Sequence, residues 1–116
     1  MYNVVKIGEK DVPMLAMASV DVYYRNIFHE DPIKIQAAET FGPAEAVELY
    51  MRLGFVMAKF AEHPKRAEMA KLNEDAFLDW MDGFDRGEFM QALGDIRLSY
   101  EGQAVTAAES KKKTGE

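Results

Sequence analysis

The first fifteen residues alternate short apolar runs with turn-forming residues. Val4 to Ile7 is a short run of β-branched residues interrupted by Lys6, Gly8-Glu9-Lys10-Asp11 offers turn chemistry, and Val12 to Leu15 resumes an extended pattern. We predict a β-hairpin over about residues 4–16, with Pro13 at an edge position because proline has no amide to donate to a ladder. Two strands alone are marginally stable in water, so this hairpin must pack on helices or pair with another chain.

Helical spacing replaces the extended pattern after Ser19. Apolar residues then fall at i, i+3, i+4 and i+7, which is one face of a helix: Val20, Tyr23, Tyr24 and Ile27. Ser19 is the expected N-cap, and the helix should end near His29-Glu30-Asp31 because Pro32 disfavours helical geometry in the residue before it. The segment from Ile33 to Phe41 fits either a short helix or a loop that closes over the core.

The most apolar element is the helix expected from Pro43 to Glu62, with proline in its first turn. Its apolar side chains cover most of the circumference, which is typical of a central helix or of one that buries a face in a partner. A five-helix monomer does not easily bury so many faces, so some apolar surface should remain exposed. The residues expected to bind a partner are Leu49, Leu53, Val56, Met57 and Phe60.

The sequence pattern after residue 62 predicts three short helical segments and a tail. A charged helix is expected within 63–72, Asn73 should cap the next, and two apolar stripes follow: Phe77, Trp80, Met81 and Phe84, then Phe89, Leu93, Ile96 and Tyr100. Residues 102–116 hold no aromatic residue and should form a disordered, flexible tail. The expected fold is mainly α: one domain over residues 1–101, with four to five helices and an N-terminal hairpin.

Composition narrows the function classes. The chain of 116 residues has a net charge of −6 and no cysteine. An acidic balance argues against nucleic acid as a ligand, and the missing thiols exclude disulfides and thiolate zinc sites and fit a reducing cytosol. The N-terminus does not read as a signal peptide. The longest apolar segment, Leu53 to Ala61, carries Lys59 and is shorter than the roughly 20 residues that span a bilayer.

Candidate chemistry is sparse. His29 and His63 lie near acids but have no helical spacing from each other, so solvated helix ends explain them better than a metal site. No nucleophile elbow or phosphate-binding glycine pattern occurs, and we expect no cofactor and no enzymatic activity. Methionine is more informative, with 8 residues in the chain. Methionine fills small cores, and it is also common on surfaces that accept varied apolar partners.

The order of elements resembles the tail assembly chaperones of long-tailed, lambda-like bacteriophages. The resemblance covers the whole chain in layout: a short hairpin, a compact acidic helical domain and a polar, lysine-rich end. Its best local matches are the Ile7-Gly8-Glu9-Lys10 turn and the Phe77-Leu78-Asp79-Trp80-Met81 helix. The resemblance implies a protein that coats the apolar, helical tape-measure protein and keeps it soluble in the host bacterial cytoplasm, and that is absent from the finished virion.

The same family implies a further expectation about a longer product. A translational frameshift near the end of the short product appends a second domain, which recruits the tail-tube protein. Lys111, Lys112 and Lys113 are the candidate site, because consecutive lysine codons can form a slippery stretch. A solvated basic tail explains the same residues. The exposed edge of the hairpin also suggests weak homo-oligomers.

Two other classes of protein compete with this interpretation. A small acidic helical adaptor or regulator would bind one defined protein partner through one face. A small enzyme with a carboxylate site would need a deep pocket lined by Asp79, Asp82 or Glu88, or tight binding of a divalent metal.

Overall fold

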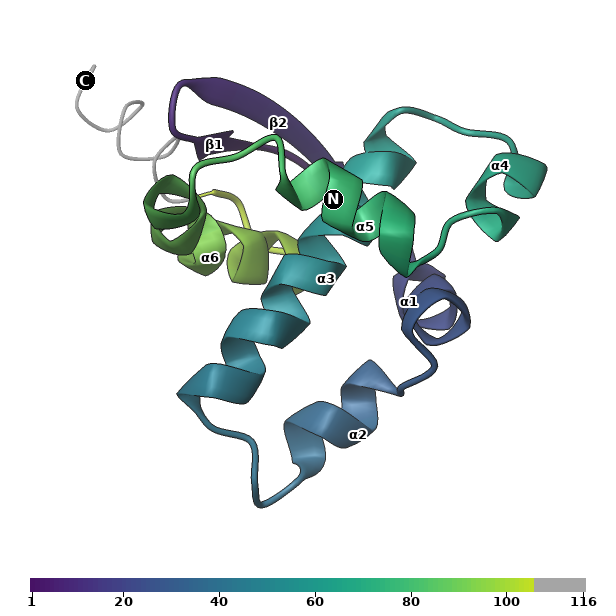
Figure 1. Ribbon diagram of the computed structural model, residues 1–116, viewed down its shortest axis with the longest axis vertical. Coiled ribbons are helices and arrows are strands. Elements are labelled where there is room, and N and C mark those ends of the chain that lie inside the picture. The colour runs from purple at the N-terminus through teal and green to yellow at the C-terminus, as the bar shows by residue number, and fades with distance from the viewer. Residues whose placement is uncertain (106–116) are drawn as a thin grey trace.

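The computed structural model describes residues 1–105, which form a two-stranded hairpin packed on a helical bundle (Figure 1). The elements are β1 (Tyr2–Ile7), β2 (Lys10–Leu15), α1 (Val20–Phe28), α2 (Pro32–Ala37), α3 (Pro43–Ala61), α4 (Arg66–Ala70), α5 (Glu74–Met81) and α6 (Arg86–Tyr100). The mainly α class with an N-terminal hairpin is confirmed. The described residues contain six helices rather than four to five, because the ambiguous segment after Asp31 does form the short helix α2 before a loop leads to Phe41.

The register of the hairpin explains how β2 tolerates Pro13. Met1 and Ala16 exchange both backbone hydrogen bonds, each 3.1 Å long. Because such pairs alternate along an antiparallel ladder, Val4 and Pro13 face each other at a position that is not hydrogen-bonded. The missing amide of Pro13 would therefore point away from β1. Gly8 has a φ of 62° at the first central position of the turn, where a type II′ hairpin requires glycine.

The core lies where the inner face of the hairpin meets α3 and α6. Val5, Ile7 and Met14 point inward from the strands and are at most 2% exposed. A Cβ at Gly54 of α3 would lie 3.3 Å from Ile96 of α6 and 3.6 Å from the end of Met14. Glycine at this point therefore lets α3 pass close under the hairpin and beside α6. The helix α2 lies at the end of the molecule away from the hairpin (Figure 1).

Short polar side chains begin several helices. Asn73 accepts a hydrogen bond from the amide of Ala76, as expected, and Asp85 accepts one from the amide of Glu88. Asp31 caps α2 through the amide of Ile33. Ser19 holds the N-cap position of α1, as predicted, but its side chain makes no capping hydrogen bond.

The folded part extends beyond the expected boundary at residue 101. Asn3 is buried and donates hydrogen bonds to Ser99 Oγ at 3.0 Å and to the carbonyl of Gln103 at 2.8 Å. Val105 is 3% exposed within the core. Residues 102–105 are therefore part of the domain, because the carbonyl of Gln103 accepts a hydrogen bond from the buried side-chain amide of Asn3 in β1. The rest of the expected tail, including Lys111, Lys112 and Lys113, lies outside the described residues.

Within residues 1–105, no helix has the length and apolar character needed to cross a bilayer.

Candidate protein-binding surface

Most of the residues expected to bind a partner lie in the core. Leu49, Leu53, Val56 and Met57 are at most 1% exposed, and only Phe60 is half-buried. The expectation of surplus apolar surface along this stretch of α3 is wrong for those four side chains. The hairpin, α1, α5 and α6 together surround α3. The apolar side chains of α3 cover most of its circumference because the helix is central in the fold.

Exposed apolar side chains gather instead on the outer face of the hairpin. Tyr2 is 54% exposed and Val4 42%, and their cross-strand partners Leu15 and Pro13 lie on the same face. These four residues are the apolar hairpin face. Strand side chains alternate between two faces, and the inner set packs on α3 and α6, so Tyr2 and Val4 of the outer set remain exposed, whereas Leu15 is partly buried.

A groove of about 350 Å³ continues this face toward α1 and α4. Its apolar lining consists of Leu15, Met17, Tyr23, Phe60 and Met69, and its rim consists of Ser19, His63, Pro64 and Arg66. The rings of Tyr23 and Phe60 meet edge to face, with centroids 5.4 Å apart, which fixes one wall. Because Leu15 belongs to both regions, the hairpin face and this methionine groove form one continuous surface.

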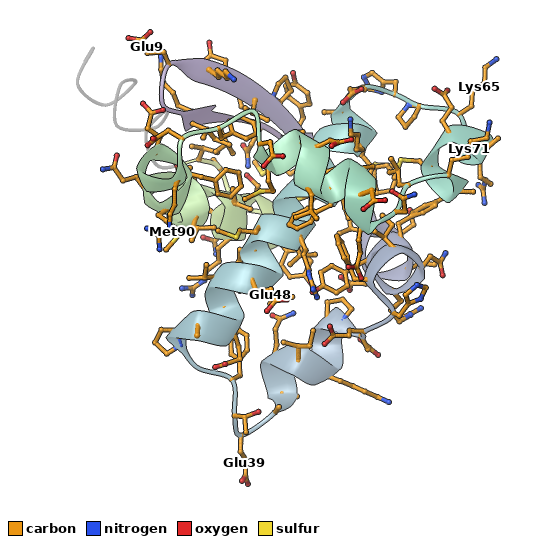
Figure 2. All side chains as sticks on the ribbon, in the orientation of Figure 1. Glu9, Glu39, Glu48, Lys65, Lys71 and Met90 are labelled. Carbon is orange, nitrogen blue, oxygen red and sulfur yellow. The ribbon has the colours of Figure 1, made fainter. Side chains whose placement is uncertain are left out.

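Basic side chains lie along the α4 side of the methionine groove. Arg66 lines it, and Lys65 and Lys71 extend outward from the two ends of α4 (Figure 2). The body of the protein is acidic overall, so this side differs from the rest in charge. A partner helix with an apolar stripe and flanking carboxylates matches such a surface.

The histidines occupy helix ends, as predicted. His29 ends α1 with a φ of 59°, and His63 follows α3 with a φ of 53°. The amide of His29 donates to the carbonyl of Arg25 at 2.8 Å, so the residue closes the last turn of α1. No group of three or more His, Asp or Glu side chains is placed to hold a metal within residues 1–105.

The carboxylates considered for acid–base chemistry are not brought together. Glu88 lines a hollow of about 240 Å³ beside the hairpin turn, together with Glu9, Lys10 and Asp85. Asp79 and Asp82 are exposed and do not line this hollow. Lys10 is held there through a hydrogen bond to the carbonyl of Gly83, so the hollow is partly filled.

The surface could be found only in part from the sequence. The period of two in Tyr2 and Val4 marks the outward face of β1, and methionine at position 17 marks an adaptable apolar site. The role of Met69 and Leu15 depends on how α1 and α4 pack together next to the end of β2, which no local pattern encodes. No protein-family model, curated protein or solved structure matches this chain.

Proposed function

We propose that this protein is a tail assembly chaperone, which binds and solubilises the tape-measure protein of a long-tailed bacteriophage in the host bacterial cytoplasm. The continuous surface of hairpin face and methionine groove supports this proposal most directly. A tape-measure protein is a long apolar helix, and the flexible, exposed side chain of Met17 can adapt to the surface of such a helix. The net charge of −6 would keep the complex soluble.

The proposal predicts that two exposed apolar side chains on this surface are needed for binding. Tyr2 and Met17 are 54% and 48% exposed, so replacing both by serine removes contact area without opening the core. Completing the burial of each is worth about 1 kcal/mol, and the double variant should bind about tenfold or more weakly. We expect co-expression with the candidate tape-measure protein to yield soluble, co-purifying complex for the natural sequence and little for this variant.

Two exposed apolar residues elsewhere provide the control. Val22 on α1 and Leu78 on α5 are 43% and 54% exposed and line neither the hairpin face nor the methionine groove. The double serine variant at these positions should solubilise the tape-measure protein as well as the natural sequence does. If the natural protein leaves the tape-measure protein insoluble, the proposal fails. If both double variants lose activity equally, the surface is wrongly assigned.

The proposal includes weak self-association through β1. The outward amides of Tyr2, Val4 and Lys6 face away from β2 and make no backbone hydrogen bond within residues 1–105. Pro13 removes one donor from the opposite edge of the hairpin, so strand addition is favoured at β1. Pairing at one edge only would stop at a dimer and would not continue into a fibre.

A proline at Val4 tests this edge. Because Val4 occupies a position that is not hydrogen-bonded to β2, Val4→Pro removes an outward amide and leaves the ladder of the hairpin intact. Sedimentation should show concentration-dependent association of the natural protein and a monomer for Val4→Pro. Val4→Thr keeps the amide and the β-branch and should associate normally. Association of the proline variant at the natural strength would show that β1 is not the interface.

A further inference from the structure

Arg66 lies in the methionine groove without an opposite charge. It lines the groove together with Met69, at the start of α4, and it is exposed. No ion pair or side-chain hydrogen bond within residues 1–105 includes Arg66. The lining of the groove contains no carboxylate, although acids outnumber bases by 20 to 14 in the chain. A partner that fills the groove therefore meets a guanidinium that is not neutralised, beside an apolar wall.

The carboxylates closest to Arg66 in the sequence are engaged elsewhere. Glu62 forms an ion pair of 3.5 Å with Lys59. Glu68 accepts a hydrogen bond of 2.9 Å from the amide of Lys65, in the capping box that begins α4. Helix α4 and its two caps together carry three cations against one carboxylate. This side of the groove is therefore basic, although the protein as a whole is acidic.

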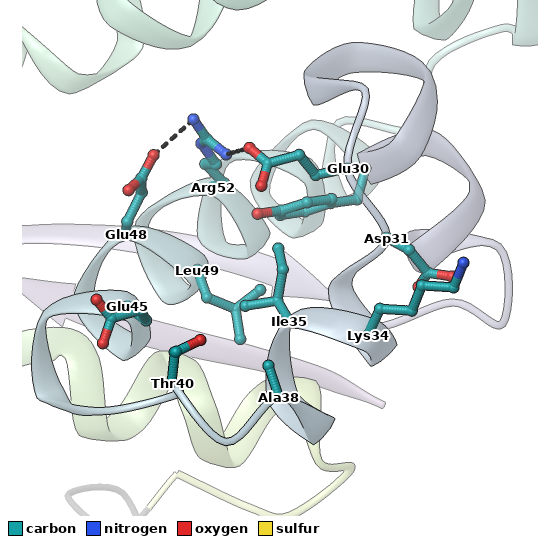
Figure 3. A pocket seen from close by; sticks show the side chains of 11 residues that line it. Glu30, Asp31, Lys34, Ile35, Ala38, Thr40, Glu45, Glu48, Leu49 and Arg52 are labelled. Carbon is teal, nitrogen blue, oxygen red and sulfur yellow. Dashed lines mark hydrogen bonds and ion pairs between the residues drawn. The ribbon is translucent and has the colours of Figure 1, made fainter.

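Arg52 shows the opposite arrangement elsewhere in the molecule. It lines a cavity of about 460 Å³ between α1, α2 and α3, and its side chain is 15% exposed. Its guanidinium pairs with Glu30 at 3.1 Å and with Glu48 at 2.6 Å (Figure 3). Because two carboxylates of the same chain hold this guanidinium, it has little to offer an external anion. Arg66 has no such internal pair in the described part of the chain, so its donors are available to a partner.

We propose that the methionine groove selects helices whose apolar stripe is bordered by carboxylates, and that Arg66 recognises the acidic border. This inference rests on the proposed function and names the class of tape-measure segment that the groove accepts. The guanidinium presents a planar fork of donors that matches a carboxylate through two parallel hydrogen bonds. The apolar wall that includes Met17 and Phe60 receives the stripe of the helix. Lys65 and Lys71 extend the positive charge along α4 and accelerate the association of an acidic partner.

Three capped peptides of about 18 residues serve as probes. They share one leucine stripe and differ only in the residues that border it, which are Glu, Gln or Lys. The natural protein should bind the Glu peptide about fivefold more tightly than the Gln peptide, and the Lys peptide most weakly. The net charge of −6 alone would give the reverse order, so this order reports the local charge at the groove. Calorimetry measures the dissociation constants. Equal affinities for the Glu and Gln peptides, or no binding of any peptide, would overturn the proposal.

One substitution tests the contact, and a second provides its matched control. Arg66→Gln should abolish the difference between the Glu and Gln peptides and leave the affinity for the Gln peptide nearly unchanged. Arg25 is also exposed and forms no ion pair within residues 1–105, but it does not line the groove. Arg25→Gln removes the same charge and should keep the full preference. If both variants reduce the preference equally, net charge causes it and the role given to Arg66 is wrong.

The methyl resonances of the methionines locate the bound peptide. Met17 and Met69 line the groove, whereas Met90 lies apart from α4 (Figure 2). Saturable shifts should occur at Met17 and Met69 and not at Met90. A Glu peptide with proline at its centre keeps the charges but cannot form one continuous helix, so it should lose most of its affinity. Undiminished binding of that peptide would indicate an extended occupant, and tighter binding of dodecanoate than of the Glu peptide would indicate an acyl chain. Either result overturns the assignment to a helix.

These measurements do not use the tape-measure protein, so they separate this inference from the proposed function. If co-expression solubilises the tape-measure protein but the Glu peptide has no advantage, only the charge preference fails. If the advantage of the Glu peptide depends on Arg66 but co-expression fails, the groove accepts acidic helices and the assignment to a tape-measure protein fails.

Discussion

Replacing Phe55 by alanine should lower the free energy of unfolding by about 3–5 kcal/mol, which is a large part of the total for a domain of this size. Phe55 is 0% exposed at the centre of α3. Its ring lies 5.6 Å from that of Phe77 and 5.7 Å from that of Trp80, so it joins α5 to the core. Truncation would leave a cavity that helices fixed on several sides cannot close.

Urea unfolding followed by the fluorescence of Trp80 and by circular dichroism measures this loss. Leu78→Ala is the matched control, because Leu78 lies on the same helix as Trp80 but is 54% exposed. That substitution should change the unfolding free energy by no more than about 0.5 kcal/mol. A loss below about 1 kcal/mol for Phe55→Ala would mean that α5 is not packed on α3 as described.

Alkaline pH should destabilise the protein through Tyr100. Burial, together with the negative charge of Asp21, raises the pKa of this phenol to about 12. Tyr100 Oη donates to Asp21 Oδ1 at 2.8 Å, so the protonated form is the one that the fold stabilises. In the unfolded chain a tyrosine ionises near pH 10, so its contribution is complete below about pH 10 and is lost as pH rises to about 12.

The size of this effect follows from the two-unit difference in pKa. Two units correspond to about 2.7 kcal/mol, and because the ring is partly exposed, screening by solvent reduces this to about 1–2 kcal/mol. Urea midpoints measured between pH 9 and 12 should fall more steeply for the natural sequence than for Tyr100→Phe. Asp21→Asn keeps the ring and removes the facing charge, so it should show an intermediate fall. An identical pH dependence for all three proteins would refute this origin.

The periodicity of the chain predicts the elements well but not the environment of each face. Alternation in residues 4–7 and the spacing of Val20, Tyr24 and Ile27 depend on local geometry, so the hairpin and α1 follow directly. The apolar stripe of α3 was interpreted as partly exposed, although it is surrounded. That difference depends on how many elements pack around the helix, which is a property of the tertiary arrangement.

The candidate sites were less accessible to sequence analysis for the same reason. The methionine groove joins residues from β2, α1, α3 and α4. Tyr24 is buried, as its place in the helical stripe predicts. Nothing local in residues 102–105, however, indicates that Asn3 needs the carbonyl of Gln103.

The link from Asn3 to Ser99 and Gln103 spans 96 and 100 residues of chain and sets an order for folding during synthesis. The buried side chain of Asn3 in β1 cannot acquire these partners until α6 and the residues after it have been made. Until then the inner side chains of the hairpin, Val5 and Ile7, lack the α6 surface that covers them. During synthesis the inner face of β1 therefore stays partly uncovered until the chain has been made through α6.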